Sequence, residues 1–83
     1  MKISDSTGTI IRTEMMRCGY TLDALSEETE ISKTVLHGIL TGRAKSISTR
    51  NICALARTFG YSATDFMDLL AGNLPMTEIN HYS

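Results

Sequence analysis

Apolar residues recur at the three- and four-residue spacing of amphipathic helices between about residue 7 and residue 70. The first stripe consists of Ile11, Met15 and Cys18. The longest stripe consists of Ile52, Leu55, Ala56 and Phe59. No alternation of apolar and polar residues runs far enough to indicate a strand. The pattern predicts an all-α chain of five short helices.

Residues that start and stop helices bound each of these segments. The expected N-caps are Ser6 or Thr7, Thr21, Ser32, Ser48, and Ser62 or Thr64. The expected stops are Gly19, Gly42, Gly60 and Gly72. The third helix should therefore span residues 32–41. We expect residues 1–72 to form one domain and residues 73–83 to form a tail, which is either disordered or in contact with a partner subunit. Pro75 in this tail prevents the last helix from continuing.

Several functional classes find little support. No apolar run approaches the ~20 residues that a membrane span needs, and the N-terminus has no apolar signal region, so we expect a cytoplasmic protein. Motifs of hydrolases, nucleotide-binding proteins and metalloproteases are missing, which argues against an enzyme. We expect no cofactor and no metal. Cys18 and Cys53 lie in apolar stripes, so we expect two buried, inert thiols.

The charge is distributed unevenly, although the whole chain carries a net charge of only −1. Residues 31–57 contain five basic side chains and no acidic one, whereas the segments before and after each sum to −3. A basic middle segment with acidic flanks is typical of a local footprint for nucleic acid. Chance clustering on a solvated face is the alternative.

Four short motifs occur in order between Tyr20 and Arg43. They are Thr21-Leu22-x-x-Leu25-Ser26, Ile31-Ser32-Lys33-Thr34, Leu36-x-x-Ile39 and Gly42-Arg43. This stretch resembles the Cro/repressor-type helix-turn-helix family, often called the xenobiotic-response-element family, and the likeness continues to about Leu70. The resemblance implies a compact, five-helix, lambda-repressor-like domain that binds DNA. It also implies a transcriptional regulator, most simply a repressor, that inserts helix 32–41 into the major groove.

Four positions depart from the family's pattern. Glu30 stands where glycine is usual in the turn, so we expect a positive φ or an altered turn there. Met15 and Leu40 replace an Arg–Glu pair that links the first and third helices in many members, and we expect their side chains to touch. Gly38 replaces a long polar side chain, and it either allows close approach to the DNA backbone or leaves one base unread.

The resemblance also suggests which residues meet DNA. Lys33 could donate to guanine, and Thr34 or Val35 could contact a thymine methyl group, although Val35 could instead be half-buried. His37 is expected near a phosphate or a base. The full expected set is Thr21, Ser32, Lys33, Thr34, Val35, His37, Gly38, Thr41, Arg43, Lys45 and Arg50.

We expect a homodimer on double-stranded DNA, paired through Phe66 and Met67 or through the tail with Met76 and Tyr82. The competing hypothesis keeps the fold but exchanges DNA for protein, as an antitoxin or anti-repressor that binds a toxin or a repressor. The mildly acidic pI of about 6.0 and Leu40 favour this alternative, and the acid-free segment 31–57 opposes it.

Overall fold

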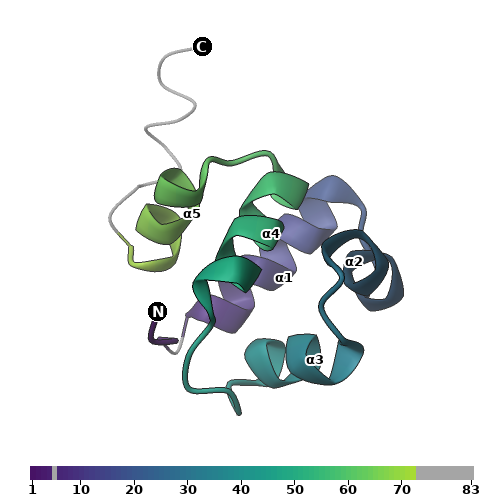
Figure 1. Cartoon of the computed structure of the whole chain (residues 1–83), viewed down its shortest axis with the longest axis horizontal. Helices are drawn as coiled ribbons and strands as arrows, with labels where there is room; N and C mark the ends of the chain where they lie inside the picture. The colour runs from purple at the N-terminus through teal and green to yellow at the C-terminus, as the bar shows by residue number, and fades with distance from the viewer. Residues whose placement is uncertain (5, 73–83) are drawn as a thin grey trace.

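The computed structural model describes residues 1–4 and 6–72, which form five α-helices (Figure 1). These are α1 (Thr7–Cys18), α2 (Leu22–Thr29), α3 (Lys33–Thr41), α4 (Thr49–Phe59) and α5 (Ala63–Leu70). The all-α, five-helix prediction is confirmed for this part of the chain. The tail contacts predicted for residues 73–83 lie outside the described residues. Within the described part, no helix is long and apolar enough to cross a membrane.

Local capping determines where four of the helices begin. The hydroxyls of Thr21, Ser32, Ser48 and Ser62 each accept a backbone N–H three residues later, at 3.1–3.2 Å. Ser6 precedes α1 but makes no side-chain cap. Instead, the hydroxyl of Thr7 accepts the backbone N–H of Ser4 at 3.0 Å. The first helix is therefore anchored to the segment before it.

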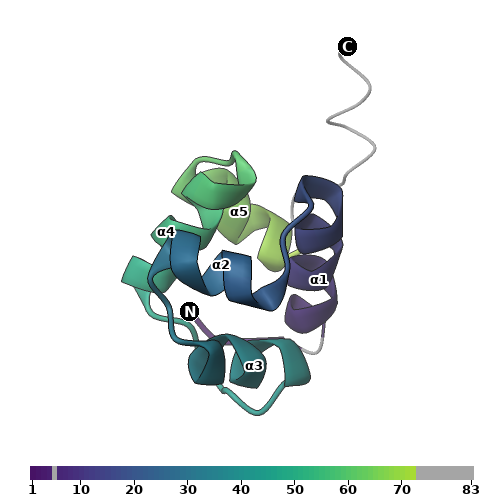
Figure 2. The same ribbon diagram turned by 90° about the vertical axis from the view of Figure 1, so that its right-hand side faces the viewer.

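The core lies where α1 and α4 meet the other helices. α1 packs against α3 and α4, and α4 also packs against α2 and α5. Leu25, Leu36, Leu55 and Phe66 are fully buried, one from each of four helices. α3 and α5 lie at opposite ends of the molecule in both views (Figures 1 and 2). The face of α3 that points away from the core is therefore free of the fifth helix.

A buried carboxylate joins α1 to the end of α4. Glu14 is only 1% exposed, and the Arg17 guanidinium binds its Oε1 through Nε at 2.7 Å. Arg17 Nη2 also donates to the Phe59 carbonyl oxygen at 2.7 Å. The hydrogen bond to Glu14 raises the pKa of Arg17 above its ordinary value. Burial, assisted by the negative charge of Glu14, raises the pKa of Tyr61.

Two expectations about individual side chains are wrong. Cys53 is exposed, because it follows Ile52 by one residue and so lies off the buried stripe of α4; Cys18 is only partly buried. Phe66 is fully buried against the rings of Phe59 and Tyr61, with centroids 5.9 and 5.7 Å away. Phe66 therefore cannot serve as a dimer contact in this fold.

The N-terminal residues pair with the loop between α3 and α4. Lys2 and Ser46 form an isolated antiparallel bridge. Ile3 donates its backbone N–H to the Lys45 carbonyl oxygen at 3.0 Å, and Ile47 donates its N–H to the Met1 carbonyl oxygen at 2.8 Å. This pairing restrains the loop that follows α3.

Candidate nucleic-acid interface

The turn between α2 and α3 is built around a residue in the left-handed region. Glu30 has φ 59°, which confirms the expected positive φ at this position. The Thr29 hydroxyl donates to the Leu25 carbonyl oxygen at 2.7 Å and accepts the N–H of Ile31 at 3.3 Å. The Ser26 hydroxyl donates to the Ile31 carbonyl oxygen at 2.6 Å. These bonds secure a turn that lacks the usual glycine.

The first half of α3 presents a row of side chains to solvent. Ser32 caps the helix, and Leu36 and Ile39 anchor it in the core. Lys33 and Thr34 are exposed, and Val35 is 45% exposed, so about half of its surface is covered and the other half is open to a contact. A capped helix with one buried face holds its outer side chains in a defined direction.

An open hollow of about 450 Å³ runs along this row, and we call it the α3 hollow. It is lined by Leu22, Lys33, Thr34, His37, Gly38 and Arg43. Five of these six residues belong to the set expected to meet DNA. The N–H of Ala44 donates to the Gly38 carbonyl oxygen at 3.0 Å, and this bond folds the following loop back against α3. Arg43 thereby lines the same hollow as Lys33, Thr34 and His37.

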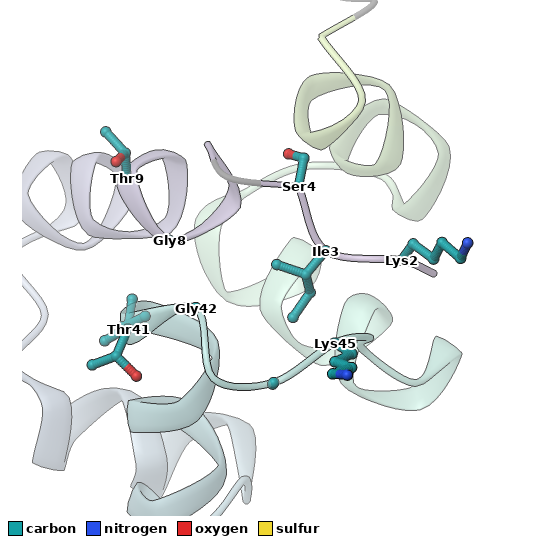
Figure 3. Close-up of a pocket in the computed structure, with 10 residues that line it drawn as sticks. Lys2, Ile3, Ser4, Gly8, Thr9, Thr41, Gly42 and Lys45 are labelled. Carbon is teal, nitrogen blue, oxygen red and sulfur yellow. The ribbon is translucent and has the colours of Figure 1, made fainter.

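A second hollow lies on the other side of the same loop, between the N-terminus of α1 and the end of α3 (Figure 3). Its volume is about 530 Å³, and its lining includes Lys2, Thr41 and Lys45. Figure 3 shows Ile3 pointing toward the loop and Lys2 pointing away from it. Two further expected contacts, Thr41 and Lys45, thus gather in this second hollow.

The other expected residues lie outside both hollows. Thr21 and Ser32 are exposed helix caps, Val35 lies on the outer face of α3, and Arg50 is exposed in the first turn of α4. All the expected residues are exposed except Gly38, which is partly exposed. No cluster of metal-ligating side chains occurs among residues 1–4 and 6–72.

Sequence reasoning missed two charged residues here. Asp23, in the first turn of α2, binds the Lys33 ammonium with an Nζ–Oδ1 distance of 3.0 Å. Lys2 reaches the loop only through the pairing of the N-terminal residues with Ser46. The sequence shows Asp23 as an acidic residue in the first turn of α2, where it suits the positive end of the helix dipole. No local pattern in the sequence identified its contact with Lys33 across the turn. No sequence signal pointed to Lys2.

The position of α3 depends on a close approach to α1 at Gly8. A Cβ atom added there would lie 2.5 Å from the Leu40 carbonyl oxygen. Only a residue without a side chain allows the two helices to meet this closely. Met15 belongs to the buried apolar cluster and Leu40 packs against that cluster. Their mutual contact remains a prediction.

Comparisons with known proteins agree with this geometry. A search of curated proteins found no match. A solved structure described as a SinR protein/SinI protein complex shares the fold, with a TM-score of 0.72 and 18% sequence identity. The match covers 92% of this chain and 74% of that one. A sequence profile for the helix-turn-helix family HTH_3 matches residues 11–66, which include α2, the turn and α3. This chain therefore belongs to the helix-turn-helix family.

Proposed function

We propose that this protein is a sequence-specific DNA-binding transcriptional regulator that inserts α3 into the major groove. The observation that carries the proposal is the exposed first half of α3, where Lys33, Thr34, Val35 and His37 project from a capped and anchored helix. An α-helix fits the major groove, where each base pair presents a distinct pattern of donors and acceptors. Membership of the helix-turn-helix family supports the same assignment.

The individual roles follow from the chemistry of each side chain. Lys33 donates to guanine O6 or N7, and Thr34 and Val35 contact thymine methyl groups. His37 lies one helical turn after Lys33 and Thr34, where it reaches a neighbouring base or phosphate. Gly38 leaves the backbone of α3 uncovered beside its neighbours in the hollow.

Phosphate contacts surround this reading helix. Arg43, Lys45 and Arg50 supply cations from the loop and from the start of α4, and Thr41 adds a hydroxyl. Thr21 and Ser32 supply hydroxyls at helix N-termini, where free backbone N–H groups also favour anions. Three cations in each of two subunits imply a log–log salt slope of about −5, since each neutralised phosphate contributes about −0.9.

We propose that the regulator is a cytoplasmic homodimer and acts as a repressor. Two subunits place two recognition helices one DNA turn apart, which gives an affinity that one small module does not reach. Occupying a promoter in this way blocks access by other proteins. Light scattering after size exclusion should give twice the chain mass of 9.1 kDa, and a monomer at high micromolar concentration would contradict the dimer.

Selection from a random duplex library, followed by anisotropy titration of the enriched sequence at several salt concentrations, tests DNA recognition. We expect an enriched palindrome and a steep negative salt slope. Lys33→Ala should weaken binding to that palindrome at least about 30-fold, because the dimer loses two base contacts worth ~1–3 kcal/mol each. Arg12→Ala is the matched control, because Arg12 is an exposed cation on α1. Absence of enrichment and of salt-dependent binding would refute the proposal.

A protein partner is the second candidate function, in the form of an antitoxin or anti-repressor. One observation favours it: the solved structure that shares this fold is described as a complex of two proteins. Co-purification of a stoichiometric partner together with failure of the DNA selection would favour this function. The two functions are compatible if the partner leaves the α3 hollow open.

A further inference from the structure

Lys33, the side chain proposed to contact a base, forms an ion pair with Asp23 in this structure. Lys33 is the first residue of α3, and its ammonium contacts the Asp23 carboxylate of α2 at 3.0 Å. The side chains of Lys33 and Asp23 are 61% and 76% exposed, so solvent surrounds the pair. Lys33 lines the α3 hollow on one side and, on the other, a hollow of about 360 Å³ that Asp23 also lines. Asp23 thus holds Lys33 from the side of α2.

The arrangement has a simple electrostatic origin. A lysine at a helix N-terminus faces the positive end of the helix dipole, and the first turn of α3 contains no acidic residue to offset it. Asp23 supplies the missing negative charge from α2, where its own position in the first turn is favourable. An exposed pair of this kind contributes little to stability, so its consequence lies elsewhere.

The consequence concerns what Lys33 can do on DNA. A lysine side chain is a flexible point charge, and without a tether it follows the nearest phosphate on any sequence. The ammonium has three N–H donors, so it can keep Asp23 and still donate to a guanine acceptor. The charges of Lys33 and Asp23 cancel, so the pair as a whole is not attracted to the DNA phosphates.

We propose that Asp23 is a specificity-determining residue, which holds Lys33 in position to read a base and prevents it from neutralising phosphates on unrelated DNA. The inference rests on the proposed DNA-binding function. Asp23 acts through Lys33, and its signature is a change in discrimination between sequences. A residue with a merely structural role would leave that discrimination unchanged.

Asp23→Asn tests the proposal on two duplexes of equal length, the selected palindrome and a scrambled sequence. On the scrambled duplex, the released lysines of the two subunits add two phosphate contacts, which steepen the salt slope by about 1.8 and tighten binding about 30-fold at 0.15 M salt. On the palindrome, affinity should stay constant or fall, because Lys33 loses its orientation. For the dimer, the ratio of the affinity for the palindrome to that for the scrambled duplex should therefore fall at least about 30-fold.

Two controls separate this effect from a change in net charge. Glu28→Gln makes the same charge change on an exposed residue of α2 that does not line the hollow shared by Asp23 and Lys33. Glu28→Gln should strengthen binding to both duplexes equally and leave the ratio of the two affinities unchanged. In a Lys33→Ala background, Asp23→Asn should also leave the ratio unchanged, because the side chain on which Asp23 acts is gone.

The outcomes are distinguishable. A reduced ratio in Asp23→Asn alone supports the inference. An unchanged ratio in Asp23→Asn, with wild-type binding intact, overturns the inference and leaves the proposed function standing. An equal reduction in Glu28→Gln or in the Lys33→Ala background also overturns it. If the wild-type protein binds neither duplex, the proposed function falls and the role of Asp23 falls with it.

Discussion

Two glycines of this protein should respond to the same substitution in opposite directions. Gly8 lies in α1 where it crosses α3, and Gly38 lies within α3 itself. An added Cβ at Gly8 would lie 2.5 Å from the Leu40 carbonyl oxygen and 3.3 Å from that of Ile39. At Gly38 the nearest atom would be the Ala44 Cβ at 3.9 Å, which is ordinary van der Waals contact. Gly8→Ala and Gly38→Ala therefore form a matched pair.

The magnitudes follow from the competition between packing and helix propensity. Gly8→Ala must move α1 or α3 by about 0.5 Å to bring the contact between the new Cβ and the Leu40 carbonyl oxygen to 3.0 Å. The nearest atoms, from Leu40 and Ile39, are all backbone, so no side chain can turn aside to make room. Overpacking of this kind costs ~1–3 kcal/mol. Alanine gains up to ~1 kcal/mol over glycine in a helix interior, and less in the first turn, where Gly8 lies. The free energy of unfolding should fall by ~1–2 kcal/mol for Gly8→Ala and rise by up to ~1 kcal/mol for Gly38→Ala.

Urea denaturation followed by circular dichroism measures both changes. Opposite shifts of the midpoint with an unchanged m-value are the expected result. If Gly8→Ala were as stable as the wild type or more so, the helices would not be in close contact at Gly8, and the proposed positioning of α3 by α1 would be wrong. Equal stabilisation of both variants would lead to the same conclusion.

Three further predictions concern the junction of α1 with α4 and the start of α3. Arg17→Ala should destabilise the protein by ~2 kcal/mol, because it leaves the buried Glu14 carboxylate unpaired. Glu14→Gln should cost less, because the half-exposed Arg17 side chain remains hydrated. Equal losses of unfolding free energy in urea denaturation would contradict this asymmetry. The raised pKa of Tyr61 means that the unfolded chain loses its phenolic proton first, so the free energy of unfolding should fall as the pH rises above about 10. In a pH titration, phenolate absorbance should show one tyrosine that ionises at higher pH than an ordinary tyrosine, and Tyr61→Phe should remove this component. If the component remains in Tyr61→Phe, it belongs to another tyrosine. Ser32→Ala should cost ~1 kcal/mol of stability by removing the cap of α3, and thermal denaturation that shows no loss would contradict the capping role.

Local features of this fold were predictable because local physics determines them. Thr21, Ser32 and Ser48 are caps whose partners lie three residues away, so the sequence is sufficient to place these helix starts. The positive φ of Glu30 was one of two expectations, the other being an altered turn, because the family that the sequence resembles usually has glycine at this position. The exposure of Lys33, Thr34 and His37 follows from helical spacing, because Leu36 and Ile39 bury the other face of α3.

Features that depend on contacts between distant segments were not predictable. The aromatic partners of Phe66, which are Phe59 in α4 and Tyr61 in the following loop, depend on how α4 and α5 pack against each other. The burial of Glu14 is possible only because Arg17 compensates its charge. The Asp23–Lys33 pair joins residues on two helices whose crossing angle the sequence pattern does not specify.

The surface that contacts DNA is the central claim, and amide chemical shifts recorded with and without the selected duplex test it most directly. We predict that the largest changes occur in the first half of α3, at residues 32–38, and in the loop at residues 43–45. Residues 63–70 in α5 should change little, because α5 lies at the opposite end of the molecule (Figures 1 and 2). Large changes confined to α5 or to the outer face of α1, with α3 unaffected, would contradict recognition by α3.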